Sequence, residues 1–286
     1  DITCMDVDLP SGRFACTGQR GAEPSVKMWN IDTATEIMIM PRAHRGAIVR
    51  VKFNKTGTRI CSVGMGDEFD PSYTLAVYCA SSQAAVGADW VGGSALLMAT
   101  QKCGNEAVMV AHWIDRVASS NAFDIFIGRQ KSVQFWRHED PKTLVSTKGI
   151  FDRAARVQPQ CSAACLGDAL VTGCANGQLY VWAGSKVRRV VPAHRGMVCS
   201  MQVVGPGGEK MVTGSRDGTV KIWDRALEIV RTFDMKQMAA QQCVRPYVRA
   251  VCMDRTMERI VVGLASSDIY EICYSSGSAT LLSRGH

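Results

Sequence analysis

Histidine, cysteine and carboxylate residues are the groups in this chain that could perform chemistry, and their spacing gives little support for a catalytic centre. A His beside an Asp can act as a general base, and His or Cys at ligand spacing can hold a metal ion. His112 falls at the end of an apolar run, and His138-Glu139-Asp140 has no second ligand group at metal spacing. The pair His194 and Asp217 fits a structural repeat better than a catalytic pair. We therefore expect no catalytic residue and no metal site.

Two glycine-rich segments could cradle a phosphate, but each lacks residues that such a loop needs. Gly64-Met65-Gly66 lacks the third glycine and the following helix of a dinucleotide-binding turn. Gly205-Pro206-Gly207-Gly208 has no Lys followed by Ser or Thr downstream. No Gly-x-Ser-x-Gly nucleophile elbow is present either. We interpret both segments as turns, and we expect no cofactor and no enzymatic activity.

The stretch that organises the chain is Met211 to Asp224, which reads M-V-T-G-S-R-D-G-T-V-K-I-W-D. Two apolar, β-branched runs flank a tight turn at Arg216-Asp217-Gly218, a pattern that predicts a β-hairpin. The distance from the glycine that ends the first run to the Trp position recurs along the chain. It is 9 residues for Gly214 to Trp223, 9 for Gly173 to Trp182, 8 for Gly128 to Trp136 and 11 for Gly18 to Trp29, with degenerate copies of 14 for Gly64 to Tyr78 and 9 for Gly263 to Ile272.

The Trp positions of these copies lie 49, 58, 46, 41 and 49 residues apart. A period of roughly 40–50 residues built from strands is typical of propeller blades. A second signal keeps the same register, because Ala43-His44-Arg45-Gly46 returns as Ala193-His194-Arg195-Gly196 before another apolar strand. The sequence therefore predicts an all-β propeller of four-stranded blades, about six in this chain. The predicted blades cover about residues 1–40, 44–91, 94–146, 147–191, 192–234 and 244–282.

Length and composition fit one large β domain over residues 1–286. The chain is 47% hydrophobic, and the continuous blade spacing leaves no linker. Because it begins on Asp1 and ends where another blade would begin, we expect it to be part of a longer propeller array. No apolar run approaches the ~18 residues of a membrane span. The twelve cysteines include no CxxC pair, and we expect those in strand runs to be reduced core residues of a cytosolic protein: Cys4, Cys16, Cys61, Cys165, Cys199, Cys252 and Cys273.

The hairpin that ends on Trp223-Asp224 resembles the WD-repeat signature. In a WD blade a His before the first strand, a Ser or Thr in the second, an Asp in the hairpin turn and the Trp of the third form a hydrogen-bonded chain. A buried Trp N–H needs such a fixed partner. The resemblance implies that this structural network comprises His194, Thr213, Asp217 and Trp223, with His44, Trp29, Trp136 and Trp182 at matching positions in other blades. Blade four has Asn176 near the Asp position, whereas blades one and three have no clear Asp and should rely more on apolar packing.

The order of several shorter motifs resembles the echinoderm microtubule-associated protein-like (EMAP-like, EML) family over nearly the whole chain. These motifs are Ile2-Thr3-Cys4, Asn105-Glu106-Ala107-Val108, Lys148-Gly149-Ile150-Phe151, Asp168-Ala169-Leu170-Val171-Thr172-Gly173 and Val248-Arg249-Ala250-Val251. Family members carry two tandem propellers after a hydrophobic motif, often with an N-terminal coiled coil. Those flanking parts are not in this sequence, so their roles are not assigned to its residues.

Charge is the remaining functional signal, because 33 basic and 26 acidic residues give a formal net charge of +7. In a WD propeller the turns after second strands and the loops into first strands share one face. A basic rim on that face favours encounter with an acidic protein; the alternative is a merely solubilising surface. The expected rim residues are Arg45, Arg195, Arg216, Arg129, Lys131, Arg153 and Arg156. We expect no nucleic-acid partner, because the basic residues are not interleaved with exposed aromatics, and no membrane partner.

Two functions are compatible with these features. The first is a non-enzymatic scaffold associated with microtubules, tubulin or another acidic protein surface, located in the cytoplasm and the cytoskeleton, the axoneme of a cilium or flagellum included. The second is a general WD-repeat adaptor in a signalling or ubiquitin-ligase complex. The resemblance to the EMAP-like family and the basic rim favour the first.

Overall fold

A computed structural model describes residues 1–8, 10–81, 94–114, 124–140, 142–151, 155–205, 207–239 and 245–285. The described part is built from β-strands, with one short helix, α1 (Met235–Met238). The chain divides into two compact units, Asp1–Lys148 and Gly149–His286, and each is described by itself.

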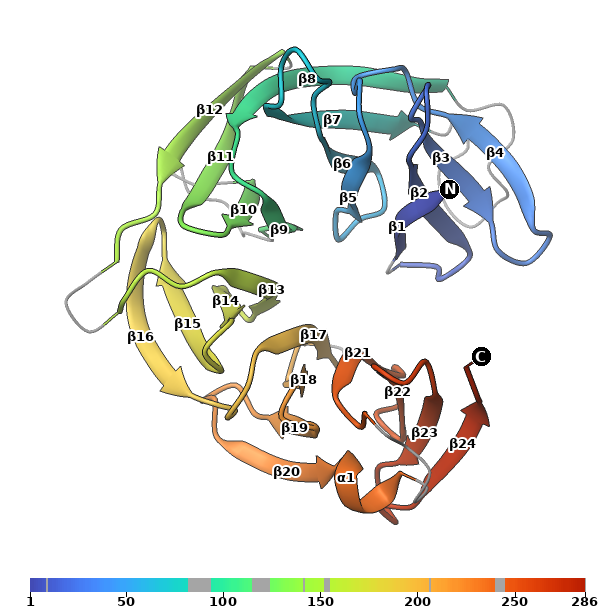
Figure 1. Cartoon of the computed structure of the whole chain (residues 1–286), viewed down its shortest axis with the longest axis vertical. Coiled ribbons are helices and arrows are strands. Elements are labelled where there is room, and N and C mark those ends of the chain that lie inside the picture. Colours follow the sequence, from blue (N-terminus) through green and yellow to red (C-terminus); the bar gives the residue numbers. More distant parts are fainter. Residues whose placement is uncertain are drawn as a thin grey trace. The chain divides into compact units, whose positions relative to one another are not determined.

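The first unit contains three four-stranded antiparallel sheets, each formed by strands consecutive in the chain (Figure 1). Their first strands, β1, β5 and β9, lie next to one another. The first sheet contains β1 (Ile2–Val7), β2 (Phe14–Gln19), β3 (Val26–Asn30) and β4 (Thr35–Ile39). The second contains β5 (Ile48–Phe53), β6 (Arg59–Gly64), β7 (Tyr73–Ser81) and β8 (Ser94–Gly104), and the third contains β9 (Val108–Trp113), β10 (Ile125–Arg129), β11 (Val133–Asp140) and β12 (Thr143–Lys148).

The second unit repeats this architecture with three more sheets of the same order. Here β13, β17 and β21 are the neighbouring first strands. The fourth sheet contains β13 (Gln160–Leu166), β14 (Ala169–Cys174), β15 (Gln178–Ala183) and β16 (Lys186–Pro192). The fifth contains β17 (Val198–Val204), β18 (Lys210–Ser215), β19 (Thr219–Trp223) and β20 (Ile229–Asp234), and the sixth contains β21 (Val248–Met253), β22 (Arg259–Leu264), β23 (Ile269–Cys273) and β24 (Ala279–Ser283).

The strand assignment between the second and third sheets differs from the sequence expectation. Residues from 94 onwards were placed in blade three, with blade two ending near 91. In the structure β8 pairs with β7 along its length and is the fourth strand of the second sheet. The boundary predicted at 91 is therefore wrong, because the register of the Trp positions did not show that β8 pairs with the strand that precedes it.

The hairpin between β18 and β19 follows the pattern of its sequence. Thr213 pairs with Lys221 and Gly214 with Val220, so the turn falls on Arg216 to Gly218. Gly218 has a φ of +90°, a left-handed conformation that glycine adopts without the strain a Cβ would cause. An Asp-Gly turn therefore closes this hairpin at the expected position.

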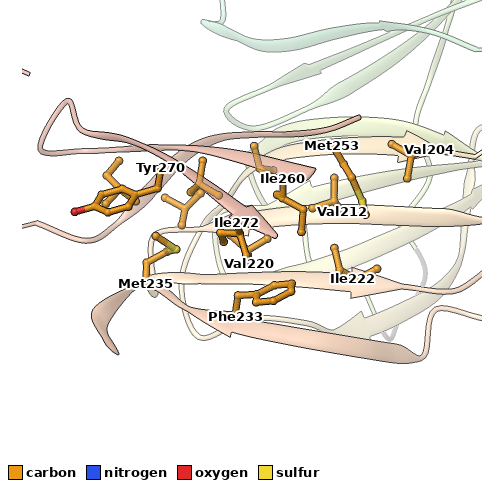
Figure 2. Close-up of a cluster of buried hydrophobic side chains, with 14 residues drawn as sticks. Val204, Val212, Val220, Ile222, Phe233, Met235, Met253, Ile260, Tyr270 and Ile272 are labelled. Carbon is orange, nitrogen blue, oxygen red and sulfur yellow. The ribbon is translucent and has the colours of Figure 1, made fainter. Parts of the chain in front are cut away.

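The core of each unit lies between the faces of successive sheets. Figure 2 shows the cluster between the fifth and sixth sheets, where Val212 and Ile222 of one sheet share a buried cluster with Ile260 and Ile272 of the next. The glycine that ends β18 permits this approach, because a Cβ on Gly214 would lie 2.5 Å from Val248 Cγ1 of β21. Gly173 and Val198 repeat the contact between the fourth and fifth sheets. The recurring glycine thus marks the place where the next sheet packs most closely.

Among the described residues, no helix is long and apolar enough to cross a membrane. The described cysteines are free thiols. Cys16 and Cys61 are buried as expected, whereas four others expected in the core are only half-buried: Cys4, Cys165, Cys199 and Cys273. Cys252 departs from the expectation, because its position on β21 leaves it exposed. Cys243 lies outside the described residues.

Candidate functional site

The network expected in blade five is present as a continuous chain of hydrogen bonds. Trp223 Nε1 donates to Thr213 Oγ1 at 2.9 Å, and Thr213 Oγ1 lies 2.8 Å from His194 Nε2. His194 Nδ1 lies 3.2 Å from an oxygen of Asp217. Because Trp can only donate and a carboxylate only accepts, Thr213 Oγ1 accepts from Trp223 and Asp217 accepts from His194 Nδ1–H. His194 Nδ1 also lies 2.9 Å from Thr219 Oγ1. The network therefore connects β18 and β19 with the hairpin turn and with the loop that enters β17.

Asp217 is the most heavily bonded member of this network. Its carboxylate accepts hydrogen bonds from the Arg195 backbone N–H at 2.8 Å, the Thr219 backbone N–H at 2.9 Å and the Thr219 hydroxyl at 2.7 Å, in addition to His194. Burial by itself raises the pKa of Asp217, but the hydrogen bonds from His194 and Thr219 outweigh it and hold that pKa well below its usual range. The carboxylate is thus a charged structural anchor, with its oxygens turned into the hairpin.

Blades one and four keep the hydrogen bond between Trp and Thr. Blade four replaces the histidine of the network by another residue. Trp29 Nε1 donates to Thr17 Oγ1 at 2.8 Å in the first sheet. In the fourth sheet Trp182 Nε1 donates to Thr172 Oγ1 at 2.9 Å, and the Thr172 hydroxyl donates to Gln160. Gln160 thus supplies the acceptor that His194 supplies in blade five, a substitution that the WD pattern did not indicate.

In the turn between β14 and β15, the side chain of Asn176 forms hydrogen bonds with Gln178, within the turn itself. Asn176 Oδ1 accepts a hydrogen bond from the Gln178 backbone N–H at 3.2 Å, and its amide nitrogen donates to the Gln178 side chain at 2.8 Å. Asn176 is exposed, so it stabilises the turn locally without extending a buried network.

Blade two retains the histidine, but no described aspartate is hydrogen-bonded to it as Asp217 is to His194 in blade five. His44 is buried, and its Nε2 lies 2.6 Å from Ser62 Oγ. Among the described residues His44 Nδ1 has no hydrogen-bond partner. Tyr78 occupies the Trp position; burial raises its pKa to about 12, and a hydrogen bond with Ser62 opposes that rise. Burial also lowers the pKa of His44 to about 4, so the ring is neutral at physiological pH.

Blade three has lost the polar partners altogether. Trp136 is buried, but its Nε1 has no partner in the described part of the chain. The pairing of β10 with β11 puts Ile127 at the position that Thr213 holds in blade five, so no hydroxyl is available. This blade relies on apolar packing, as its sequence suggested.

Arg129 in the same blade corrects a sequence expectation. It was placed on the partner-binding rim, yet only 5% of its surface is exposed at the end of β10. Its guanidinium fills the space beside Gly104, where a Cβ would lie 2.8 Å from Arg129 Nη1. Gly104 has the same offset from β9 that His194 has from β17, so the arginine occupies the volume that a histidine ring fills in blade five. Arg129 is therefore unavailable to a partner.

The other rim residues of the first unit are largely compensated. Arg45 is exposed, but its Nη1 lies 3.3 Å from Asp67 Oδ2. Two further exposed basic residues of this unit, Arg42 and Lys102, are paired with Glu23 and Asp70. Lys131 alone among the proposed rim residues here is exposed without an ion pair to a described residue. The first unit thus contributes little uncompensated positive charge.

The rim residues of the second unit that the structure describes are exposed. Arg156, Arg195 and Arg216 form no ion pair with any residue that the structure describes. Arg153 lies outside the described residues. The distribution of charge agrees: Asp1–Lys148 has 16 basic and 15 acidic residues, whereas Gly149–His286 has 17 and 11. The second unit therefore carries +6 of the net charge of +7.

Two exposed aromatic residues were missed by the sequence analysis. Phe69 is 97% exposed in the loop between β6 and β7, where Asp67 accepts hydrogen bonds from the Phe69 and Asp70 backbone N–H groups. Tyr247 is 41% exposed just before β21. Neither follows a repeat position, and the length of the Phe69 loop was the only available signal.

The groups considered for chemistry remain separate. The described residues contain no group of three or more His, Cys, Asp or Glu side chains that could hold a metal ion. His138 lies 3.7 Å from Asp124, and no further ligand joins them. The polar side chains that the fold does bring together are those of the blade networks and the basic loops.

Comparison with known proteins agrees with this geometry. The family model of the WD domain, G-beta repeat (WD40), matches residues 185–224, which cover β16 to β19. The chain is also similar to the Cps50 (Swd1) β-propeller domain of Myceliophteria thermophila, with a TM-score of 0.74 over 100% of this chain and 87% of that chain, at 12% identity. An identity this low shows the fold alone. The chain therefore has a WD40 repeat and a propeller fold of six four-stranded blades, and the predicted fold class is confirmed.

Removing the carboxylate of Asp217 should destabilise the protein strongly. Asp217→Ala leaves His194 and the Arg195 and Thr219 N–H groups without their acceptor, at a cost of about 1–3 kcal/mol in the free energy of unfolding. Asp168→Ala is the matched control, because Asp168 is exposed in the turn between β13 and β14 and should change stability by about 0.5 kcal/mol or less. Urea unfolding measures both; equal midpoints would contradict the role of Asp217.

The two buried tryptophans should respond differently to loss of their N–H groups. Trp223→Phe removes a hydrogen bond to Thr213, whereas Trp136→Phe removes a donor that has no partner among the described residues. Trp223→Phe should therefore cost about 1 kcal/mol more than Trp136→Phe. Thermal and urea unfolding of the two variants test this, and a larger loss for Trp136→Phe would show that its N–H is bonded after all.

Stability should fall as the pH drops from about 6.5 to 4. Burial lowers the pKa of His44 to about 4, while the unfolded chain keeps about 6.5. The unfolded state therefore binds more protons in this window, and the free energy of unfolding decreases by at most about 3 kcal/mol. His112, whose pKa burial also lowers to about 4, acts in the same direction. His44→Gln should show a shallower loss between pH 7 and 4.5 in urea unfolding; an unchanged slope would argue against a buried neutral His44.

Proposed function

We propose that this chain, a WD40 propeller by fold, is a non-enzymatic scaffold that associates with microtubules or tubulin. The resemblance of its motif order to the EMAP-like family supports the cytoskeletal assignment. A WD40 propeller is suited to protein interaction, because its loops present many side chains from a rigid array of sheets. The proposed role is to hold a protein partner and not to transform a substrate.

The observation that carries the proposal is the uncompensated positive charge of Gly149–His286. Arg156, Arg195 and Arg216 are exposed, and no described carboxylate pairs with them. Asp217, next to Arg216, has its oxygens engaged inside the hairpin. Exposed charges without internal partners are free to attract an oppositely charged protein, and they raise the association rate most at low salt. Tubulin surfaces are acidic and complement this charge.

The proposed location follows from the proposed partner. A tubulin-binding scaffold would act in the cytoplasm on the cytoskeleton, the axoneme of a cilium or flagellum included. The alternative remains an adaptor propeller in a signalling or ubiquitin-ligase complex, which the fold alone would serve equally well. Binding to microtubules distinguishes the two.

Charge reversal at the β18–β19 hairpin should weaken binding to microtubules. Arg195→Glu combined with Arg216→Glu changes the net charge by −4 without touching the core, since both side chains are exposed. In cosedimentation at low salt, the apparent affinity should fall by about tenfold or more, and the difference should shrink as salt shortens the Debye length to about 3 Å at 1 M. Microtubules stripped of their acidic tubulin tails should bind the unmodified chain weakly.

The control carries the same charge change in the same unit. Lys186→Glu combined with Arg188→Glu alters exposed residues of β16, and neither has an ion-pair partner among the described residues. This variant should retain most of its binding. If the two variants lose binding equally, or if the unmodified chain does not sediment with microtubules at low salt, the proposal is rejected in favour of the adaptor function.

A further inference from the structure

The β18–β19 hairpin has close neighbours from two later segments of the chain. Gly218 packs against the side chain of Lys236 in α1, where a Cβ on the glycine would lie 3.0 Å from Lys236 Cε. The same Cβ would lie 3.3 Å from the Pro246 carbonyl oxygen. The Met235 backbone N–H donates to Gly218 O at 2.9 Å, which fixes α1 against the turn. The hairpin, α1 and the segment that enters β21 therefore form one continuous surface.

Basic residues are concentrated on this surface. Arg216 lies in the turn, Lys236 on α1, and Arg245 and Arg249 on either side of the contact at Pro246. Arg195 joins them, because its backbone N–H donates to Asp217. Each of the five side chains is exposed, and none has an ion-pair partner among the residues that the structure describes. Five uncompensated positive charges thus surround one hairpin.

The carboxylates beside these basic residues accept hydrogen bonds from backbone N–H groups. Asp217 accepts the hydrogen bonds that close the hairpin, and Asp234 caps α1 by accepting from the Lys236 backbone N–H at 2.9 Å. Both oxygens of Asp217 and one oxygen of Asp234 are thus hydrogen-bonded, and neither carboxylate forms an ion pair with a described arginine or lysine. The positive charge of the surface is therefore directed to solvent.

One aromatic side chain lies among these charges. Tyr247 follows Pro246 directly and is 41% exposed, while its backbone oxygen accepts a hydrogen bond from Ala265 at 2.8 Å. The bond holds the backbone of Tyr247 in place beside the sixth sheet. A partly exposed tyrosine that lies between Arg245 and Arg249 in the chain has the composition that interface hot spots favour, because its ring offers apolar area at low entropic cost.

We propose that Arg195, Arg216, Lys236, Arg245, Tyr247 and Arg249, named here the hairpin patch, form a docking site for an acidic peptide segment that carries an aromatic or large apolar side chain. The five charges complement the acidic residues of the segment, and Tyr247 contacts its apolar side chain. The inference rests on the proposed function for its acidic partner, but it adds a defined site and a requirement for an apolar residue.

The Phe69 loop of the first unit provides a natural contrast. Phe69 is far more exposed than Tyr247, but it lies between Glu68 and Asp70, and the nearby Arg45 and Lys102 are paired with Asp67 and Asp70. An acidic peptide meets no excess positive charge there. Phe69→Ser is therefore the matched control for Tyr247→Ser.

The test measures fluorescence anisotropy with two labelled peptides, one of glutamates around a central phenylalanine and one with serine in its place. The unmodified chain should bind the phenylalanine peptide about fivefold to tenfold more tightly at low salt. Tyr247→Ser should remove that preference and keep the affinity for the serine peptide. Phe69→Ser should behave like the unmodified chain. Arg249→Glu, on the exposed side of β21, should weaken both peptides and keep the preference.

The outcomes separate this inference from the proposed function. No preference for phenylalanine in the unmodified chain, or a preference that survives Tyr247→Ser, overturns the hairpin patch as described. If Tyr247→Ser melts at a lower temperature, the Arg249→Glu result still decides whether acidic peptides bind here, because equal binding by that variant also overturns the proposal. If the chain binds microtubules but does not prefer the phenylalanine peptide, the hairpin patch is rejected and the proposed function stands. If the chain prefers the phenylalanine peptide through Tyr247 but does not bind microtubules, the cytoskeletal function is rejected and the hairpin patch stands.

Discussion

Close packing between successive sheets is the constraint on which the rest of this structure depends. Each sheet has two faces, and within a unit the second strand of one sheet lies against the first strand of the next. Gly214 against Val248 and Gly173 against Val198 leave no room for a Cβ, so the sheets meet at the distance that glycine allows. The clusters behind these contacts are apolar and nearly free of solvent. Removal of that area from water is the main source of stability.

The polar networks refine this packing and do not replace it. Only blade five, among the described residues, links Trp, Thr, His and Asp in one chain of hydrogen bonds. Blade four substitutes Gln160 for the histidine. In blade three Trp136 Nε1 has no partner in the described part of the chain, and Arg129 packs beside Gly104. Since all these blades form the same four-stranded sheet, the apolar contacts suffice for the architecture. The full network instead fixes the hairpin that carries Arg216, which makes it relevant to binding.

The positive charge available at the surface depends more on which basic residues form ion pairs than on how many basic residues each unit contains. Both units contain many arginines and lysines, but three exposed ones near the loops of the first unit, Arg42, Arg45 and Lys102, have carboxylates within 4 Å. In the second unit the carboxylate of the corresponding hairpin turn, Asp217, accepts hydrogen bonds from His194 and from the Thr219 backbone N–H. The carboxylate that anchors blade five is thus hydrogen-bonded inside the hairpin, and it forms no ion pair with the neighbouring Arg195 and Arg216. Stability and the proposed recognition of acidic partners are coupled at this turn.

The sequence by itself determined the blade period, the strand order within most blades and the network of blade five. These features depend on local signals: a glycine at the closest contact, an Asp-Gly turn and a Trp about nine residues later. Such signals are local because a hairpin is formed by neighbours in the chain. They sufficed to assign the all-β class and to place His194, Thr213, Asp217 and Trp223 in one blade.

Only the tertiary structure decided which residues are available at the surface. It assigned β8 to the second sheet, buried Arg129 against Gly104 and paired Arg45 with Asp67. It also brought Lys236 and Tyr247 to the hairpin of Arg216, although they lie 20 and 31 residues further along the chain. Burial and ion pairing depend on which distant segments pack together, and side-chain spacing along the chain does not carry that information.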